Sequence, residues 1–295
     1  MKYLESFIIP NENAESGFIL SFPYQFEMMC YSHENAYPFK IFPQKEFSHI
    51  DFDHVTIFYG GNGSGKSTLL NIIAQKLALA RSAPFNNTPL MKDYLRLCDF
   101  TLSCEKLPEE SRIITSDDVF NYLLDLRTLN EGVDGRREEL FEEYRKLTDP
   151  SEPAFLMRTM DDYDELKQRN EARHSTKSAY VTKRLNTREI KGKSNGESAF
   201  YYFTEHIREN ALYLLDEPEN SLSPKLQTEL LAFLEDSVRF FGCQIIMSTH
   251  SPFLLSMQGA KIYDLDSTPV AAKQWTELEN VRIYHDFFEK HKKQF

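Results

Sequence analysis

The sequence has little of what disulfide frameworks, zinc modules or membrane spans require. It holds four cysteines, Cys30, Cys98, Cys104 and Cys243, and no C-x-x-C pair. Their spacing fits no zinc module, so we expect incidental reduced thiols. No run of about 18 apolar residues occurs, which excludes an ordinary membrane-spanning helix. The N-terminus also lacks the apolar core and cleavage site of a signal peptide, so we expect a cytoplasmic protein with no membrane partner.

Positive charge is also scarce, because the formal net charge is −11. Such a chain is not expected to coat nucleic acid over its whole surface, although a local basic groove remains compatible with it. Residues 173–193 are the exception, with seven basic residues against one acid. This segment could contact DNA or RNA phosphates, or it could be a solvated helical face. The sequence favours neither interpretation.

What the sequence does contain is a glycine-rich loop. Residues 60–68 read G-G-N-G-S-G-K-S-T and match the phosphate-loop pattern G-x-x-x-x-G-K-[ST] at every fixed position. An apolar strand pattern precedes the loop and a helical pattern follows it, which is the context in which this motif binds a nucleoside triphosphate. The predicted binding residues are Gly60, Gly61, Asn62, Gly63, Ser64, Gly65, Lys66, Ser67 and Thr68.

Each residue type in this loop has a physical task. The glycines allow successive backbone N–H groups to turn inward around phosphate oxygens, and the following helix adds its positive dipole end. Lys66 would reach the β- and γ-phosphates as a catalytic cation, and the Ser67 hydroxyl would ligate Mg²⁺. The loop therefore predicts a magnesium–nucleotide site.

Two further strand patterns end in residues that suit the same site. Residues 211–218 read A-L-Y-L-L-D-E-P, so that an apolar strand ends in Asp216 and Glu217. Asp216 is the expected Mg²⁺ partner, and Glu217 could polarise the attacking water. Another apolar strand ends before His250, which could donate to the γ-phosphate or to the water. Taken alone, each motif would be interpreted as a surface turn. The presence of a phosphate loop in the same sequence makes Asp216, Glu217 and His250 candidates for the nucleotide site.

The distribution of apolar residues predicts an α/β fold with a mostly parallel core sheet, an N-terminal antiparallel β subdomain and an α-helical insertion. Within the insertion, Gly132, Gly135, Pro150 and Pro153 are expected to divide the helices into short pieces. The predicted parts are an N-terminal β lobe over 1–83, the insertion over 84–190, a second lobe over 191–275 and an amphipathic tail over 276–295.

Together these motifs resemble the ABC-type ATPases. Residues 60–68 are similar to their Walker A motif, 214–218 to the end of Walker B, and 248–252 to the switch histidine. Residues 193–197, K-S-N-G-E, are similar to the family signature L-S-G-G-Q/E, with Lys193 and Asn195 departing from it. The resemblance implies ATP as the nucleotide, sandwiched within a homodimer or higher oligomer. It also implies that Ser194, Gly196 and Glu197 bind the ATP held by the opposite protomer.

Two family elements are altered in this sequence. The D-loop, which covers 219–224, has Ser223 where the family has aspartate. No Q-loop glutamine is evident, and Asp117 or Asp118 stands at a plausible place for it. A helix N-cap is an equally good interpretation of these two acids.

Asn62 and Glu197 resemble the non-transporter branch of the family, which includes chromosome-maintenance, RecF-like and OLD-like proteins. The run D-E-P-E-N and the later S-T-H-S-P resemble small bacterial stand-alone AAA-type ATPases. This implies an ATPase that switches nucleic acid or an effector protein, for example a nuclease, in phage defence or DNA maintenance. The alternative is the nucleotide-binding subunit of an ABC membrane transporter, which would carry a clear Q-loop glutamine and an intact signature.

Overall fold

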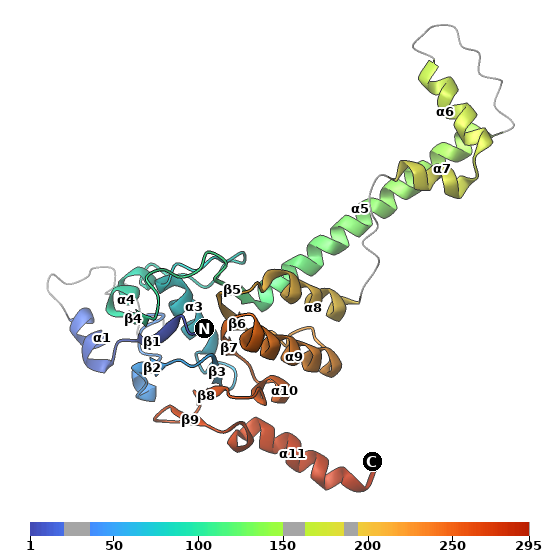
Figure 1. Cartoon of the computed structure of the whole chain (residues 1–295). Coiled ribbons are helices and arrows are strands. Elements are labelled where there is room, and N and C mark those ends of the chain that lie inside the picture. The colour runs from blue at the N-terminus through green and yellow to red at the C-terminus, as the bar shows by residue number, and fades with distance from the viewer. Residues whose placement is uncertain (21–35, 150–162, 186–193, 295) are drawn as a thin grey trace. The chain divides into compact units, whose positions relative to one another are not determined.

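The computed structural model of the protein describes residues 1–20, 36–149, 163–185 and 194–294 (Figure 1). The chain forms two compact units, one built from Met1–Asn121 with Asn195–Phe295 and the other from 122–194. Helix α5 (Ser116–Thr148) begins in the first unit and continues into the second. Among the described residues, no helix is both long enough and apolar enough to cross a membrane.

A six-stranded sheet in the order β5-β6-β7-β3-β8-β9 forms the centre of the first unit. Every residue of its three middle strands is buried, as expected for parallel strands covered on both faces. Only β9 pairs antiparallel with its neighbour, so the predicted parallel core sheet is confirmed. The strands are β3 (Val55–Tyr59), β5 (Arg112–Thr115), β6 (Leu212–Asp216), β7 (Gln244–Ser248), β8 (Lys261–Asp264) and β9 (Ala271–Lys273).

A separate antiparallel sheet, in the order β2-β1-β4, confirms the predicted N-terminal β subdomain. It consists of β1 (Leu4–Ile8), β2 (His49–Asp51) and β4 (Asp99–Leu102). Strands β4 and β5 lie in the stretch 84–121, which the sequence assigned to the helical insertion but which belongs to the first unit. Both strands have four residues, too few for an alternating pattern to stand out against the helical patterns beside them.

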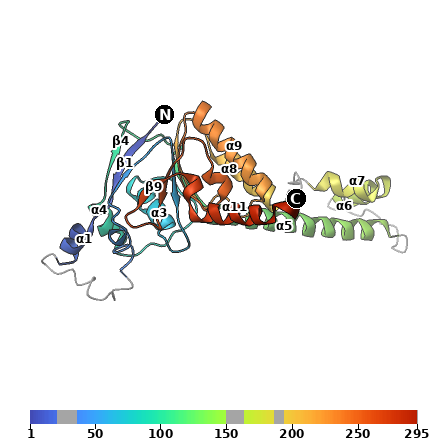
Figure 2. The ribbon, with the colours of Figure 1, turned by 90° about the horizontal axis from the view of Figure 1, so that it is seen from below.

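Helices cover both sides of the parallel sheet, with α3 on one side and α8 and α9 on the other (Figures 1 and 2). One apolar cluster includes Leu4 of β1, Ile73 of α3 and Leu214 of β6, so α3 is packed between the two sheets. The helices of this unit are α1 (Glu12–Ile19), α3 (Lys66–Lys76), α4 (Met91–Leu97), α8 (Asn195–His206), α9 (Pro224–Phe240), α10 (Pro252–Leu255) and α11 (Glu279–His291). Short 3₁₀ turns are η1 (Pro43–Lys45), η3 (Trp275–Glu277) and η4 (Lys292–Gln294).

The second unit contains most of α5 together with α6 (Tyr163–His174) and α7 (Lys177–Arg184). Helix α5 runs without a break through Gly132 and Gly135, contrary to the expected division at these residues. Each glycine costs only about 1 kcal/mol relative to alanine, and a long helix with apolar contacts near its end tolerates that cost. Those contacts join Leu140 and Leu147 of α5 to Ala172 of α6 and to Tyr180 and Val181 of α7. Pro150 and Pro153 lie outside the described residues.

One of the buried side chains that join the two sheets is Gln244, at the start of β7. Its Oε1 accepts hydrogen bonds from the backbone N–H groups of Tyr3 (2.7 Å) and Leu4 (2.8 Å). Its amide group donates to the carbonyl oxygens of Leu4 (2.8 Å) and Asp53 (3.0 Å). All four polar sites of the side chain therefore serve backbone groups where β1 meets the core sheet.

We expect Gln244→Leu to lower the free energy of unfolding by about 2–5 kcal/mol, because it leaves buried backbone donors and acceptors without partners. Urea unfolding followed by circular dichroism measures the change. The control is Gln258→Leu, since Gln258 is exposed. Equal unfolding midpoints for the two variants would contradict the prediction.

Candidate functional site

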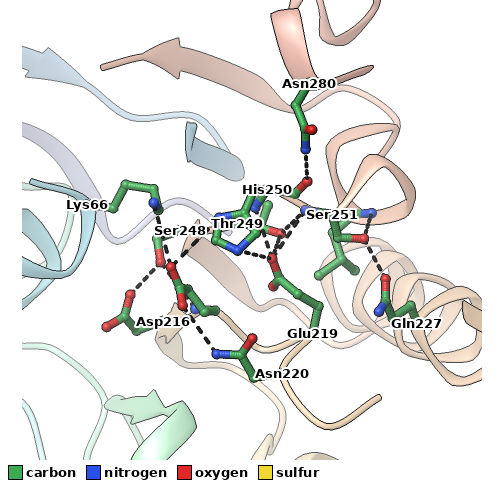
Figure 3. A network of polar contacts seen from close by, with 12 residues as sticks. Lys66, Asp216, Glu219, Asn220, Gln227, Ser248, Thr249, His250, Ser251 and Asn280 are labelled. Carbon is green, nitrogen blue, oxygen red and sulfur yellow. Dashed lines mark hydrogen bonds and ion pairs between the residues drawn. The ribbon is translucent and has the colours of Figure 1, made fainter. Parts of the chain in front are cut away.

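The candidate site forms where three neighbouring parallel strands, β6, β7 and β3, end at the same edge of the sheet. The glycine loop 60–65 follows β3, the pair Asp216–Glu217 ends β6, and His250 lies two residues after β7. These segments are far apart in the sequence, and the strand order brings their side chains together (Figure 3). This is the edge at which open α/β sheets bind ligands.

The backbone of the glycine loop requires glycine at particular positions. Gly63 and Gly65 have φ angles of 82° and 97°, in the left-handed region, and Gly65 is the N-cap of α3. A Cβ atom at Gly60 would lie 2.6 Å from the Ser64 hydroxyl oxygen. A residue that follows β8 also contacts the loop, since the Gly61 N–H donates to Asp266 Oδ2 at 2.7 Å. The loop therefore has the tight backbone curve that directs N–H groups at phosphate oxygens.

Lys66 is almost fully buried, with 4% of its surface exposed. Its ammonium group donates to the carbonyl oxygens of Gly60 (2.7 Å) and Gly61 (3.1 Å). It also lies 3.6 Å from Glu217 Oε1. The cation predicted to bind phosphate and the acid predicted to act on water are thus direct neighbours.

Ser67 and Asp216, the predicted Mg²⁺ ligands, are in contact, since the Ser67 hydroxyl donates to Asp216 Oδ1 at 3.0 Å. Ser248 donates to the same oxygen at 2.5 Å. Burial raises the pKa of the Asp216 carboxyl, while the bonds from Ser248 and Ser67 and the charge of Lys66 partly offset this. A hard cation would relieve the cost of burying this carboxylate, and carboxylate and hydroxyl oxygens are the donors that Mg²⁺ prefers. The residues present fit the ion.

Glu217 follows the last residue of β6 and has a φ of 49°, a left-handed conformation that is uncommon outside glycine. Its N–H donates to the Ser248 carbonyl at 3.1 Å, which holds this turn against the end of β7. Its Oε1 lies 3.8 Å from His250 Nδ1, and its Oε2 accepts from the Asn220 amide at 3.2 Å. The structure therefore places two of the predicted catalytic residues, Lys66 and His250, beside the carboxylate of the third, Glu217.

Four residues of this site were missed by the sequence analysis. Ser248 and Asn220 contact Asp216 and Glu217, and Asp266 holds the glycine loop. Tyr37 lies near Thr68, and burial raises the pKa of its phenol. Asn220 and Ser248 carried a signal, because they lie within the D-loop and the switch-histidine motif, whereas Asp266 and Tyr37 reach the site through chain folding.

The two Q-loop candidates differ in their surroundings. Asp118 is buried, and its carboxylate accepts hydrogen bonds from the N–H groups of Ala83 (2.6 Å) and Thr115 (2.7 Å) and from the Thr115 hydroxyl. Asp117 is exposed in the first turn of α5. The structure thus places Asp118 in the arrangement of a helix-capping residue.

The residues similar to the signature lie at the start of α8. Ser194 directly precedes this helix, Gly196 and Glu197 are in its first turn, and Lys193 lies outside the described residues. A Cβ atom at Gly196 would lie 2.8 Å from a methyl group of Leu226 and 3.3 Å from the Ser221 carbonyl oxygen. Glycine therefore allows α8 to contact the D-loop and the start of α9 closely.

In the described part of the basic segment 173–193, which ends at residue 185, several cations have partners within the second unit. Lys183 pairs with Glu171, and Arg184 lies 3.0 Å from Glu143 and 3.1 Å from Glu171. The Lys177 ammonium lies 4.4 Å from the centre of the Phe141 ring. These contacts support the interpretation of a helical face, and residues 186–193 lie outside the described chain.

Comparisons with known proteins agree with this geometry. A family model described as "ABC transporter" matches residues 48–220, more than half of the chain. A second, described as "AAA domain, putative AbiEii toxin, Type IV TA system", matches residues 187–256. A search of curated proteins gives no match.

Two solved structures are similar to this chain over most of the length of both chains. One is titled as an inward-facing conformation of a "putative metal-chelate type ABC transporter", with 17% identity, a TM-score of 0.38, and 79% of this chain and 78% of that chain covered. The other is a dimeric ATP-binding cassette with ADP and phosphate bound, with 15% identity, a TM-score of 0.36, and 79% and 91% covered. At these TM-scores the similarity carries no further conclusion about this chain.

The backbone of the loop yields a prediction about binding. Gly65→Ala should weaken ATP binding by about tenfold or more, because alanine at a φ of 97° is strained and Ile41 lies 3.1 Å from the new Cβ. Titration with a fluorescent ATP analogue measures the affinity. Gly17→Ala is the control, since nothing lies within 4 Å of a Cβ there. Wild-type affinity in Gly65→Ala would show that the loop does not need this conformation.

Proposed function

The chain belongs to the ABC transporter family of P-loop ATPases, and we propose that within this family it is an ATP-dependent switch that dimerises around ATP and controls a partner. Members of this family bind and hydrolyse ATP. The observation that carries the proposal is the group formed by Lys66, Glu217 and His250, beside the paired Ser67 and Asp216. It contains a phosphate-binding cation, an acid, a histidine and the oxygen donors for Mg²⁺ in one place.

In the proposed mechanism, N–H groups of loop 60–65 and the Lys66 ammonium hold the phosphates of ATP. Ser67 and Asp216 would hold Mg²⁺, which neutralises phosphate charge when it is bound. Glu217 orients a water molecule and accepts its proton as the water oxygen attacks the γ-phosphorus. The bond to the bridging oxygen then breaks, and ADP and phosphate form. His250, 3.8 Å from Glu217, stabilises the carboxylate or the γ-phosphate.

The proposed dimer is inferred from the position of the residues similar to the family signature. Ser194 and Glu197 are exposed at the N-terminal end of α8, a 12-residue helix, and the positive end of a helix dipole favours an anion. We infer that Ser194, Gly196 and Glu197 bind the γ-phosphate of ATP held by a second copy. ATP would then be enclosed between two chains, and its hydrolysis would open the pair.

The second family match supports a role in the non-transporter branch, because the description of that family names a toxin of a toxin–antitoxin system. We propose a cytoplasmic switch for an effector protein, for example a nuclease, or for nucleic acid, in phage defence or DNA maintenance. The competing candidate is the nucleotide-binding subunit of a membrane transporter, favoured by the name of the family that matches residues 48–220. Affinity purification in detergent distinguishes the two candidate functions. Recovery of a membrane permease together with the chain would refute the proposed switch.

The dimer is tested by Glu217→Gln. This change removes the acid that acts on water but leaves the phosphate-binding groups, so hydrolysis should fall by about 100-fold or more while binding survives. We expect light scattering to show a stable dimer at saturating ATP and a monomer without it. Lys66→Ala is the matched control, expected neither to bind ATP nor to dimerise. A Glu217→Gln protein that stays monomeric with bound ATP would rule out a sandwich formed by this chain alone.

A further inference from the structure

Glu219, the first residue of the D-loop, has surroundings that the proposed mechanism does not use. Its side chain is buried, with 7% exposed, although it carries a carboxylate. Its Oε1 accepts three hydrogen bonds, from the Thr249 hydroxyl (2.6 Å) and from the N–H groups of His250 (2.9 Å) and Ser251 (3.2 Å). Among the described residues, no donor reaches its Oε2. Buried polar groups left unsatisfied in this way are rare and call for a physical explanation.

The three donors belong to the turn that carries His250. This turn follows the last residue of β7 and precedes α10, and its Thr249 N–H donates to the Phe58 carbonyl of β3, whereas the N–H groups of His250 and Ser251 donate to Glu219. Bonds from N–H groups to a carboxylate are stronger than bonds between neutral groups. The Glu219 carboxylate therefore holds the backbone N–H groups of His250 and Ser251 and the hydroxyl group of Thr249 (Figure 3).

The same turn is held from a second direction by α11. The side-chain amide of Asn280 donates to the His250 carbonyl at 2.8 Å. The imidazole itself lies between two acids, with Nδ1 3.8 Å from Glu217 Oε1 and Nε2 4.0 Å from Glu219 Oε1. The backbone of His250 is therefore held by Glu219 and Asn280, and its ring lies beside the Glu217 carboxylate.

We propose that Glu219 is a positioning residue that couples the D-loop to His250. The inference rests on the proposed role of His250 in hydrolysis. Ser221 of the same loop lies against Gly196 at the start of α8, where this chain would bind the ATP held by a second copy. A shift of the D-loop is thus transmitted through the Glu219 carboxylate to the histidine turn. Glu219 contacts no residue of loop 60–68 in the described hydrogen bonds, so it should affect hydrolysis and not ATP affinity.

The first test measures the turn directly in the nucleotide-free protein. Glu219→Ala should increase hydrogen–deuterium exchange of the His250 amide by about tenfold, because this N–H loses its acceptor, whereas the Ser251 N–H also donates to the Thr249 hydroxyl oxygen at 3.0 Å. Glu229→Gln is the control, since Glu229 lies on α9 with 46% of its side chain exposed, in an exposed pair with Lys225. Unchanged exchange at the His250 amide in Glu219→Ala would overturn the proposal, and this measurement needs no ATP hydrolysis.

The second test measures hydrolysis in single and double variants. Glu219→Ala should lower kcat between about tenfold and a hundredfold with unchanged ATP affinity, and Glu219→Gln, which keeps an acceptor oxygen, should recover part of the rate. If Glu219 acts through His250, the double variant with His250→Ala is no slower than His250→Ala alone. Multiplied effects would show an independent structural role and overturn the inference.

The two tests also separate this inference from the proposed function. Full activity of His250→Ala would refute the role of His250 itself. A slow His250→Ala beside a fully active Glu219→Ala would refute only the coupling through Glu219. Thermal unfolding of each variant distinguishes a lower rate of ATP hydrolysis from a loss of the folded structure.

Discussion

The parallel pairing of β6 and β3 with β7 is the constraint on which the rest of the site depends. Parallel neighbours end at the same edge of a sheet, so three segments distant in sequence deliver their side chains to one place. In this register Ser248 stands beside Asp216, and it donates to that carboxylate. A shift of one residue between β6 and β7 would turn these side chains to opposite faces.

The charged side chains that the sheet brings together are then stabilised by their polar and charged partners. A buried cation, Lys66, lies between backbone carbonyl groups and Glu217, while the buried Asp216 is held by two hydroxyl groups. Each charged group is costly to bury, and each has a charged or polar partner within reach. The left-handed backbone at Glu217 belongs to the same arrangement, because it directs this acid towards Lys66 and His250. Local strain of this kind is typical of functional sites.

Much of the fold could be predicted because its signals are local. The apolar runs of β3, β6 and β7 are long enough to identify buried strands, and the glycine loop has an unmistakable pattern. Strands β4 and β5 were missed because four residues carry too little periodicity. The continuity of α5 was missed because the cost of Gly132 and Gly135 is small compared with the gain from neighbouring turns and from packing near Leu140.

The sequence by itself determined the phosphate loop, the acidic pair after β6 and the histidine after β7, since each depends on residue types at short spacing. Only the tertiary structure decided that Lys66, Glu217 and His250 meet, and that Ser248, Asp266 and Glu219 support them. These contacts join residues between 31 and 205 positions apart. Their formation depends on strand order and register, which arise from the packing of the whole sheet and have no counterpart in a short stretch of sequence.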